Sequence, residues 1–526
     1  MQCPPTVETE VAAELAAVRP ALGPRFTAAL PGARAAVLTR LWRALVHDPL
    51  PWITRREPGR EGITLHLRDG RRLHGPHADP YATAGYVTEV RLDGTAHDDP
   101  ARLMTLLGVP HGIDFAAELA HSAASLALSR AAQEPTASDK WPTQDWEWEQ
   151  RVVDGHPFHP NCRSRPGFSV AEQLAYGPEH RPSVTLRLLP VPAGECLVSG
   201  EWPTELRDGS RLLIPVHPWQ AEHVLKRSGP AGPEAHPLMS LRTLALSGDT
   251  HVKTALSARL TSSVRDISVG SVAASAALSD FAQTLAGHTG GLLHFTRTFG
   301  AATADSPDLA AVLRESPAVY AGPGEHVVPV AALATIEPAT SPSWRAEFAR
   351  LALTVGLRLL EAGVALEAHG QNLLVVLSAS GAPLRLVYRD LADIRVGPSR
   401  LARHGVPLPE DLPARILTDD VRALRRKLYG SLVAGSLATA TGSRTALRAA
   451  LETAVRDLPR TPDLVALCEE PVPAKALTLM RLSPEVSGDQ WAELPNPMAT
   501  HGDRPRFRRC SRSVAHPVLW RDTPDQ

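Results

Sequence analysis

The sequence predicts an α+β (mixed α/β) protein, and three observations lead to that prediction. Apolar residues recur three and four positions apart in residues 8–48, 112–134 and 344–362, which predicts amphipathic helices. Apolar and polar residues alternate in residues 62–94 and 183–216, which predicts strands joined by turns. The length of 526 residues indicates about three domains or one large lobed unit.

Composition and charge exclude several classes of function. The chain has 55 basic and 56 acidic residues, a formal net charge of −1, and 43% hydrophobic residues. This balance argues against disorder and against a general nucleic-acid or membrane-surface binder, so no such partner is expected. Five of the 55 basic residues are lysines, so the other 50 (55 − 5) are arginines.

Cysteine usage and the N-terminus predict a cytoplasmic protein. The five cysteines are widely spaced and form no CxxC motif, so a disulfide scaffold or a structural zinc site is not expected. The N-terminus has neither the basic nor the apolar region of a secretory signal. No apolar run approaches the roughly 18 residues that predict a transmembrane helix.

The remaining elements are predicted in chain order. Between residues 251 and 299, a strand with the sequence HVKTALSARL precedes a helix near 275–287. Gly363 is the expected C-cap of the helix at 344–362. The chain is mostly helical from 406 onward, with a Pro/Arg-rich end after about 500. These shifts suggest a division into residues 1–140, 141–300 and 301–526.

Residues 367–393 contain the most informative pattern, two strands (373–377 and 384–389) around the turn SASGAP. An antiparallel hairpin would place the start of the first strand beside the end of the second. Carboxylate and amide oxygens that meet there suit Mg²⁺, which also retains phosphate oxygens. An ordinary hairpin with polar ends is the alternative. The residues brought together are Glu367, His369, Gln371, Asn372, Arg389 and Asp390.

Protein kinases hold Mg·ATP with a similar arrangement, an Asn before one strand and an Asp after the next. They also need an Asp a few residues before that Asn, whereas His369-Gly370-Gln371 stands here. Neither a GxGxxG loop after a strand nor a GxxxxGK[ST] motif is present. The hairpin therefore predicts nucleotide and metal binding without the base for phosphotransfer.

Residues 155–167, GHPFHPNCRSRPG, hold two histidines that are each followed by proline. Proline blocks a regular helix and stiffens this loop. His156 and His159, with Arg163 and Arg165, suit a polycarboxylate or a phosphate. The alternatives are a structural loop fixed by proline or an HxxH metal pair that lacks a third ligand.

Hydroxyl residues stand next to basic residues in two further segments, and such groups are good donors to phosphate and carboxylate. A third segment, LAAVLRESP, contains Arg314 and Glu315, and its simplest interpretation is a helix end with a solvated charge pair. The two segments are SLRT, with Ser240, Arg242 and Thr243, and KTALSARLTSSVR, with Lys253, Thr261, Ser262 and Arg265.

Together and in this order, these motifs resemble the IucA/IucC-type NRPS-independent siderophore synthetases. The resemblance extends from residue 155 to residue 498, and one short motif alone would not be specific. The matching motifs are GHPFHPNCRSRPG, SLRT, K…LTSSVR, LRESP, EAHGQN, YRD and KALTLMRL…NPM.

The resemblance implies a cupped-hand fold, with a thumb in residues 1–140, fingers in 141–300 and a kinase-like palm in 301–526. It also implies an AMP-forming ligase that needs ATP and Mg²⁺. In this family a carboxylate, often citrate, attacks the α-phosphate of ATP to form an acyl adenylate and pyrophosphate. An amine or alcohol then displaces AMP. Dimers are common in the family, so a homodimer is expected.

The resemblance assigns roles to individual residues. His159, Lys253 and Arg265 look catalytic: Lys253 resembles the lysine that reaches the phosphates, Arg265 the arginine that holds the carboxylate and its adenylate, and His159 the imidazole near citrate and the α-phosphate. Glu367, Asn372 and Asp390 resemble the magnesium ligands. The residues similar to substrate ligands are His156, Arg163, Arg165, Thr261, Ser262 and Arg314, and those similar to nucleotide ligands are Ser240, Arg242, Thr243, His369, Gln371 and Asn372.

The chain departs from the family pattern at two places. Arg163 stands where the family usually has lysine, and Gly435-Ser436 stands where it often has Asn-His. The second departure concerns the pocket for the amine or alcohol. A kinase-like phosphotransferase and a catalytically impaired nucleotide-binding protein of the same fold are the alternative functions.

Overall fold

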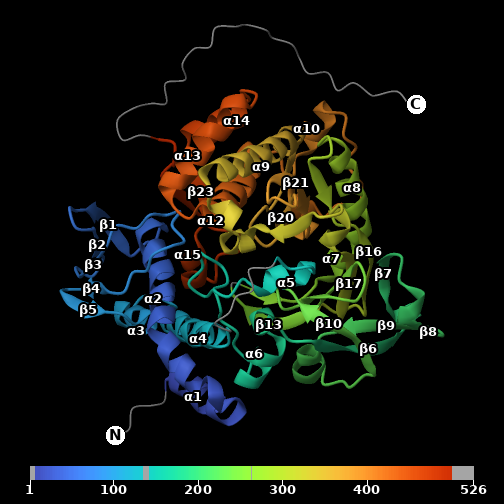
Figure 1. The fold of residues 1–526 in the computed structure, drawn as a ribbon, viewed down its shortest axis with the longest axis horizontal. Coiled ribbons are helices and arrows are strands. Elements are labelled where there is room, and N and C mark those ends of the chain that lie inside the picture. The colour runs from blue at the N-terminus through green and yellow to red at the C-terminus, as the bar shows by residue number, and fades with distance from the viewer. Residues whose placement is uncertain (1–5, 134–140, 262, 500–526) are drawn as a thin grey trace.

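The computed structural model describes residues 6–133, 141–261 and 263–499. Helices and sheets of these residues pack around three large apolar cores. Helices and sheets mix along the whole chain (Figure 1), which confirms the predicted mixture of helix and sheet. Among the described residues, no helix is long and apolar enough to cross a membrane. The division of the sequence into three regions stays a prediction.

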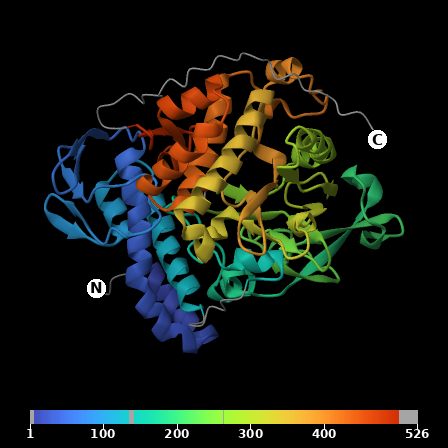
Figure 2. The same cartoon turned by 45° about the horizontal axis from the view of Figure 1, so that its top comes forward.

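The N-terminal core lies between helices and a small antiparallel sheet. Helix α2 packs along α4, and both views show the two side by side (Figures 1 and 2). The sheet has the order β1-β2-β3-β4-β5. The helices are α1 Val7–Val18, α2 Gly23–His47, α3 Pro100–Leu107 and α4 Gly112–Ala131, and the strands are β1 Ile53–Pro58, β2 Ile63–Leu67, β3 Arg72–Gly75, β4 Val90–Leu92 and β5 Thr95–His97.

The second core lies on a nine-stranded sheet with the order β7-β16-β17-β12-β11-β10-β6-β9-β8. Helices α7 Val269–Ala273 and α8 Ser275–Gly287 pack on β16 and β7, and α5 Asp145–Gln150 and α6 Val170–Tyr176 precede the sheet. Its strands are β6 Val184–Pro192, β7 Leu197–Gly200, β8 Arg207–Asp208, β9 Arg211–Val216, β10 Ala231–Pro237, β11 Thr243–Ala245, β12 Thr250–Thr254, β16 Thr298–Thr303 and β17 Ala310–Glu315.

The third core lies around a four-stranded sheet with the order β15-β21-β20-β18. The predicted hairpin is confirmed: β20 and β21 are antiparallel, with Leu373 opposite Tyr388. The strands are β15 Leu293–Phe295, β18 His326–Pro329, β20 Leu373–Leu377 and β21 Pro383–Tyr388, and the helices are α9 Pro342–Ala362, α10 Pro398–Arg403, α11 Val421–Ser431, α12 Ala438–Thr441, α13 Arg444–Ala454 and α14 Pro462–Glu469.

Helix α9 shows why its sequence begins and ends a helix where it does. The Ser341 hydroxyl accepts a hydrogen bond from the backbone N–H of Trp344, and Pro342 occupies the first position, where no N–H is needed. Gly363 ends the helix with φ 106°, as predicted. A Cβ at Gly363 would lie 2.8 Å from the Gly397 carbonyl oxygen, so only glycine fits.

Three predictions about the elements need correction. The interpretation of LAAVLRESP as a helix end is wrong, because residues 310–315 form β17 between β12 and β16. The strand predicted in HVKTALSARL is two strands, β12 and β13 Leu256–Leu260, and β13 pairs with β14 Ser263–Arg265. The mostly helical end also contains the pair β23 Val472–Lys475 and β24 Trp491–Leu494. The end after residue 500 and Ser262 lie outside the described residues.

Helix α15 Leu477–Leu482 packs into the N-terminal core, where its Leu479 and Leu482 are buried. Asp48, at the end of α2, accepts hydrogen bonds from the backbone N–H groups of Thr478 (3.1 Å) and Leu479 (3.3 Å). Burial raises the pKa of Asp48 from 3.8 to about 6, against the opposing effect of Arg43. The buried carboxylate of Asp48 therefore links the end of α2 to the start of α15.

We expect Asp48→Ala to lower the free energy of unfolding by about 1 kcal/mol, the usual loss for a helix cap. Asp48→Asn keeps an acceptor oxygen and removes the charge. Because folding raises this pKa, the carboxyl group stabilises the fold most below pH 3.8, and this contribution is lost as the pH rises through about 6. Denaturant unfolding at pH 4.5 and 7.5 should show wild type losing stability relative to Asp48→Asn. Parallel behaviour of the two proteins would contradict the assignment.

Candidate active site

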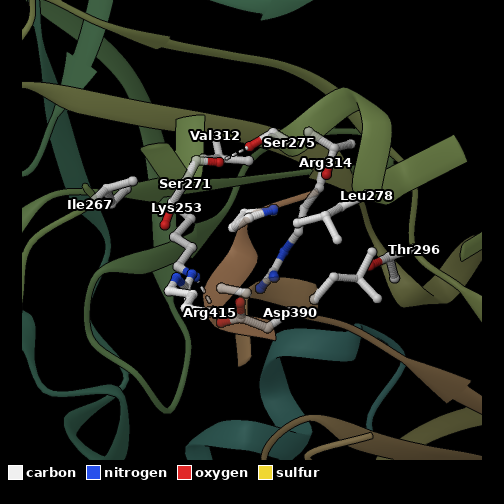
Figure 3. Close-up of a pocket in the computed structure, with 14 residues that line it drawn as sticks. Lys253, Ile267, Ser271, Ser275, Leu278, Thr296, Val312, Arg314, Asp390 and Arg415 are labelled. Carbon is white, nitrogen blue, oxygen red and sulfur yellow. Dashed lines mark hydrogen bonds and ion pairs between the residues drawn. The ribbon is translucent and has the colours of Figure 1, made fainter. Parts of the chain in front are cut away.

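The nine-stranded and four-stranded sheets meet at an ion pair between Lys253 and Asp390. Lys253 lies in β12, and its Nζ is 2.7 Å from Oδ2 of Asp390, directly after the predicted hairpin. Figure 3 shows the Lys253 and Arg314 side chains directed toward Asp390. Asp390 has φ 72°, a left-handed conformation that is unusual for a residue other than glycine. The pairing thus brings together motifs that are 137 residues apart.

The electrostatics of this cluster favour an anionic ligand. Burial opposes ionisation of Asp390, but Lys253 and Arg314 outweigh it and hold the pKa of the carboxyl group far below its usual range. Burial lowers the pKa of Lys253 to about 8 and the pKa values of Arg242 and Arg314 to about 10. One carboxylate therefore faces several partly desolvated cations. Within the described part of the chain, the buried Nε of Arg314 has no hydrogen-bond partner.

A pocket of about 620 Å³, counting the open space at its mouth, lies against this cluster. Hydroxyl groups of α7 and α8 (Ser271 and Ser275) and apolar side chains such as Leu278 of α8 and Val312 of β17 line it (Figure 3). Arg415 lines the pocket as well, and no motif in the sequence indicated it. The lining residues are Lys253, Ile267, Ser271, Ser275, Leu278, Thr296, Thr298, Val312, Arg314, Asp390, Leu391, Ala392, Pro413 and Arg415.

The SLRT turn lies directly beside Lys253. Thr243 is opposite Lys253 in the β11–β12 pair, and its backbone N–H donates to the Ser240 hydroxyl at 3.2 Å. The Arg242 guanidinium donates to the backbone carbonyls of Arg265 (2.7 Å) and Asp266 (2.6 Å). Arg242 therefore contributes positive charge to the pocket and also fixes the strand that carries Arg265.

A second group of residues surrounds an unpartnered imidazole. His159 is buried, its Nδ1 accepts from the backbone N–H of Asn161, and its Nε2 has no hydrogen-bond partner among the described residues. Burial, together with the charges of Arg481 and Arg265, lowers the pKa of His159 to about 3. Thr261, with φ 58°, donates its backbone N–H to the carbonyl oxygen of Ser164 at 3.4 Å. This contact joins the TSSVR segment to the HP-x-HP loop.

His156 organises the HP-x-HP loop and links it to the hairpin. Its Nδ1 accepts hydrogen bonds from the backbone N–H groups of Phe158 and His159. Burial holds the pKa of His156 well below its usual value, and His159 and His369 act in the same direction. The imidazoles of His156, His159 and His369 therefore lie close together and uncharged. They form a buried imidazole wall near Arg265.

Arg163 and Arg165 are engaged away from the Lys253–Asp390 cluster. Both pair with the fully buried carboxylate of Glu179, at 3.4 Å and 2.9 Å, and Arg163 also donates to the backbone carbonyls of Val152 and Val153. The structure therefore gives them a structural role in the loop. A direct contact of either arginine with substrate stays a prediction.

The EAHGQN loop contains a second ionic cluster, which the sequence did not indicate as such. Oε1 of Glu367 lies 2.8 Å from Nζ of Lys475 and 3.2 Å from Nζ of Lys427. Burial opposes ionisation of Glu367, but the two lysines hold the pKa of its carboxyl group below the usual value. Lys427 is itself buried and also pairs with Asp393 at 2.9 Å.

The buried ion pair of Arg389 and Glu149, 2.6 Å apart, fixes the end of the hairpin. Arg389 also donates to the carbonyl oxygen of Gln371, and its backbone N–H donates to that of Asn372. The other carboxylate oxygen of Glu149 accepts from the backbone N–H of Met239, next to the SLRT turn. Glu149, which no motif indicated, thus positions both the hairpin and this turn.

The predicted magnesium ligands fit the ion only in part. Among the described residues, Lys253 alone hydrogen-bonds to the Asp390 carboxylate, and the amide oxygen of Asn372 at the same hairpin end is not engaged. Asp390 and Asn372 therefore suit Mg²⁺, which needs one or two such protein ligands together with phosphate oxygens. Oε1 of Glu367 is paired with Lys427 and Lys475, so a part for Glu367 in a magnesium site stays a prediction. No group of three or more His, Cys, Asp or Glu residues within the described ranges could hold a metal.

Comparison with known families agrees with this arrangement. The sequence model of the IucA/IucC family matches residues 145–335, and that described as "Ferric iron reductase FhuF-like transporter" matches residues 342–443. The first range contains the SLRT turn and Lys253, and the second contains the hairpin and Asp390. The two matches therefore cover both sides of the Lys253–Asp390 pair.

Curated relatives are similar over part of their length. The chain is 26% identical over 309 residues to a Bacillus anthracis citryl-spermidine/3,4-dihydroxybenzoyl-citryl-spermidine:spermidine ligase, covering 46% of this chain and 50% of that protein. It is 33% identical over 172 residues to the Escherichia coli N(2)-citryl-N(6)-acetyl-N(6)-hydroxylysine synthase, covering 26% and 30%. The chain thus spans about half the length, or less, of these relatives.

Solved structures match over nearly the whole described fold. The petrobactin biosynthesis protein AsbB from Bacillus anthracis has a TM-score of 0.73 and 19% identity, covering 89% of this chain and 96% of that chain. The ATP-bound aerobactin synthetase IucA from Klebsiella pneumoniae has a TM-score of 0.69 and 20% identity, covering 89% and 99%. The ordered motifs, the match of residues 145–335 to the IucA/IucC family model and this shared fold together show the similarity of the chain to the IucA/IucC family.

Proposed function

We propose that this protein is an ATP-dependent ligase that adenylates a polycarboxylate such as citrate and joins it to an amine or alcohol. The observation that carries the proposal is the cluster of Lys253, Arg242, Arg314 and Arg265 around the carboxylate of Asp390, beside a pocket that Lys253, Arg314 and Asp390 line. Cations that are already fixed in a partly desolvated pocket stabilise a polyphosphate and the charge that develops on it. Two relatives, a ligase named for citryl-spermidine and spermidine and a synthase named for a citryl-hydroxylysine product, support this choice.

The reaction needs no protein nucleophile. A substrate carboxylate oxygen attacks the α-phosphorus of ATP, and the bond to the leaving pyrophosphate breaks, which gives an acyl adenylate. Lys253 and Arg314 stabilise the phosphate charge, and Arg265 holds the carboxylate in line for attack. His159 offers an unpartnered Nε2 to the same substrate. The amine or hydroxyl oxygen of the second substrate then attacks the acyl carbon and releases AMP.

The fold positions these groups from three regions, for which we propose the cupped-hand arrangement. The N-terminal helices would form the thumb, the nine-stranded sheet the fingers, and the four-stranded sheet with its helices a kinase-like palm. Asp390 and Asn372 would hold Mg²⁺, which would supply positive charge to the phosphate groups of ATP. The proposal extends to a homodimer in the cytoplasm.

Incubation of the protein with Mg·ATP, citrate and hydroxylamine should yield a hydroxamate, AMP and pyrophosphate, because hydroxylamine captures an acyl adenylate. Chromatography of the nucleotides and a colorimetric hydroxamate assay would measure the products. Formation of ADP and a phosphorylated product would contradict adenylation and support a phosphotransferase, the alternative that the hairpin favours. Binding of ATP without turnover over a panel of polycarboxylates would indicate an impaired member of the fold.

Arg265→Ala should lower the rate of pyrophosphate release by about 10² to 10³, the range for removal of one charged donor from a preorganised site. The matched control is Arg259→Ala, which removes an exposed arginine from β13, the partner strand of β14. Both variants should unfold at the wild-type temperature. Normal pyrophosphate release by Arg265→Ala would refute the role given to this residue.

A further inference from the structure

A π-helical segment, η11 Leu432–Leu437, continues α11 and packs on the loop that carries Glu367 and His369. Such segments insert one residue into a helix. They are rare overall, and those that occur are often found at functional sites. Lys427, one turn before the end of α11, already contacts Glu367 in this loop. The face of the helix that carries Lys427 therefore continues into η11 and contacts the same loop.

Two serines of this face hold the main chain of Ala368, the residue between Glu367 and His369. The Ser431 hydroxyl accepts from the backbone N–H of Ala368 at 2.9 Å, and it donates to the carbonyl oxygen of Lys427 at 2.7 Å. The Ser436 hydroxyl donates to the carbonyl oxygen of Ala368 at 2.5 Å. Both main-chain polar groups of Ala368 thus have a serine partner.

The π geometry is what allows the second contact. Ser431 and Ser436 are five residues apart, the spacing of a π-helical hydrogen bond, whereas position 435 is the residue that an α-helical hydrogen bond would join to Ser431. Gly435 occupies that position, and a Cβ there would lie 3.7 Å from Cβ of His369, an ordinary contact. With the inserted residue, the Ser436 hydroxyl donates to the carbonyl oxygen of Ala368, and Gly435 lies against His369.

We propose that Ser431 and Ser436 are positioning residues that fix the peptide groups of Ala368 and thereby orient Glu367 and His369. A rotation about Ala368 would move Glu367 from Lys475 and Lys427 and would move His369 from the buried imidazole wall. Ser436 is fully buried, so its loss would leave a carbonyl oxygen without a partner. The effect on catalysis rests on the proposed ligase function, whereas the effect on the loop does not.

The test compares Ser436→Ala with Thr441→Val, which also removes a buried hydroxyl but one that bonds only to its own helix. Hydrogen–deuterium exchange of the peptide that contains residues 366–373 reports on the loop directly. Pyrophosphate release at saturating substrates gives kcat, and its dependence on ATP gives KM. Ser431→Ala is a second variant of the same contact.

In both serine variants we expect exchange of the loop amides to rise at least about tenfold, and kcat to fall at least about tenfold with little change in KM for ATP. Thr441→Val should do neither. Unchanged exchange in both serine variants would overturn the proposal, and so would faster exchange with a normal kcat. If wild type releases no pyrophosphate, the ligase function fails, and the exchange measurement still decides whether the serines hold the loop.

Discussion

The ion pair of Lys253 and Asp390 is the interaction on which the site depends, because it joins the nine-stranded sheet to the hairpin of the four-stranded sheet. Without Asp390, the four buried or half-buried cations would lose the carboxylate that acts on all of them. The single negative charge of Asp390 attracts each of these cations, but it does not neutralise all four. The remaining positive charge favours an anionic ligand, which is what the proposed function requires.

The sequence predicted the hairpin well and its partners poorly, for a physical reason. Strand alternation and a turn are local, so the positions of Asn372 and Asp390 followed from spacing alone. Lys253 joins Asp390 from 137 residues away, and only the order of the motifs connected the two. The segment LAAVLRESP has apolar spacing that suits a helix, but pairing with β12 and β16 on both sides makes it a strand, and no local pattern carries that information.

Charged residues show the same limit more sharply. Arg163, Arg165 and Arg265 are the same residue type within related motifs, yet Glu179 holds the first two and leaves only the third near the cluster. The residue type of Glu367 suits a metal ligand, and in the structure Lys427 and Lys475, two of the five lysines in the chain, pair with its Oε1. The partner that a charged side chain finds in the folded protein decides its role, and that partner is set by tertiary structure.

The packing of α15 into the N-terminal core has a consequence for biosynthesis of the chain. Ala476, Leu479, Leu482 and Ala492 complete a core whose other members lie mainly before residue 132. A ribosome that has made the N-terminal helices must add roughly 350 more residues before that core can close, and contacts so distant in sequence form slowly. Until then the nascent chain exposes an apolar surface, so assembly in the cell would depend on protection from aggregation.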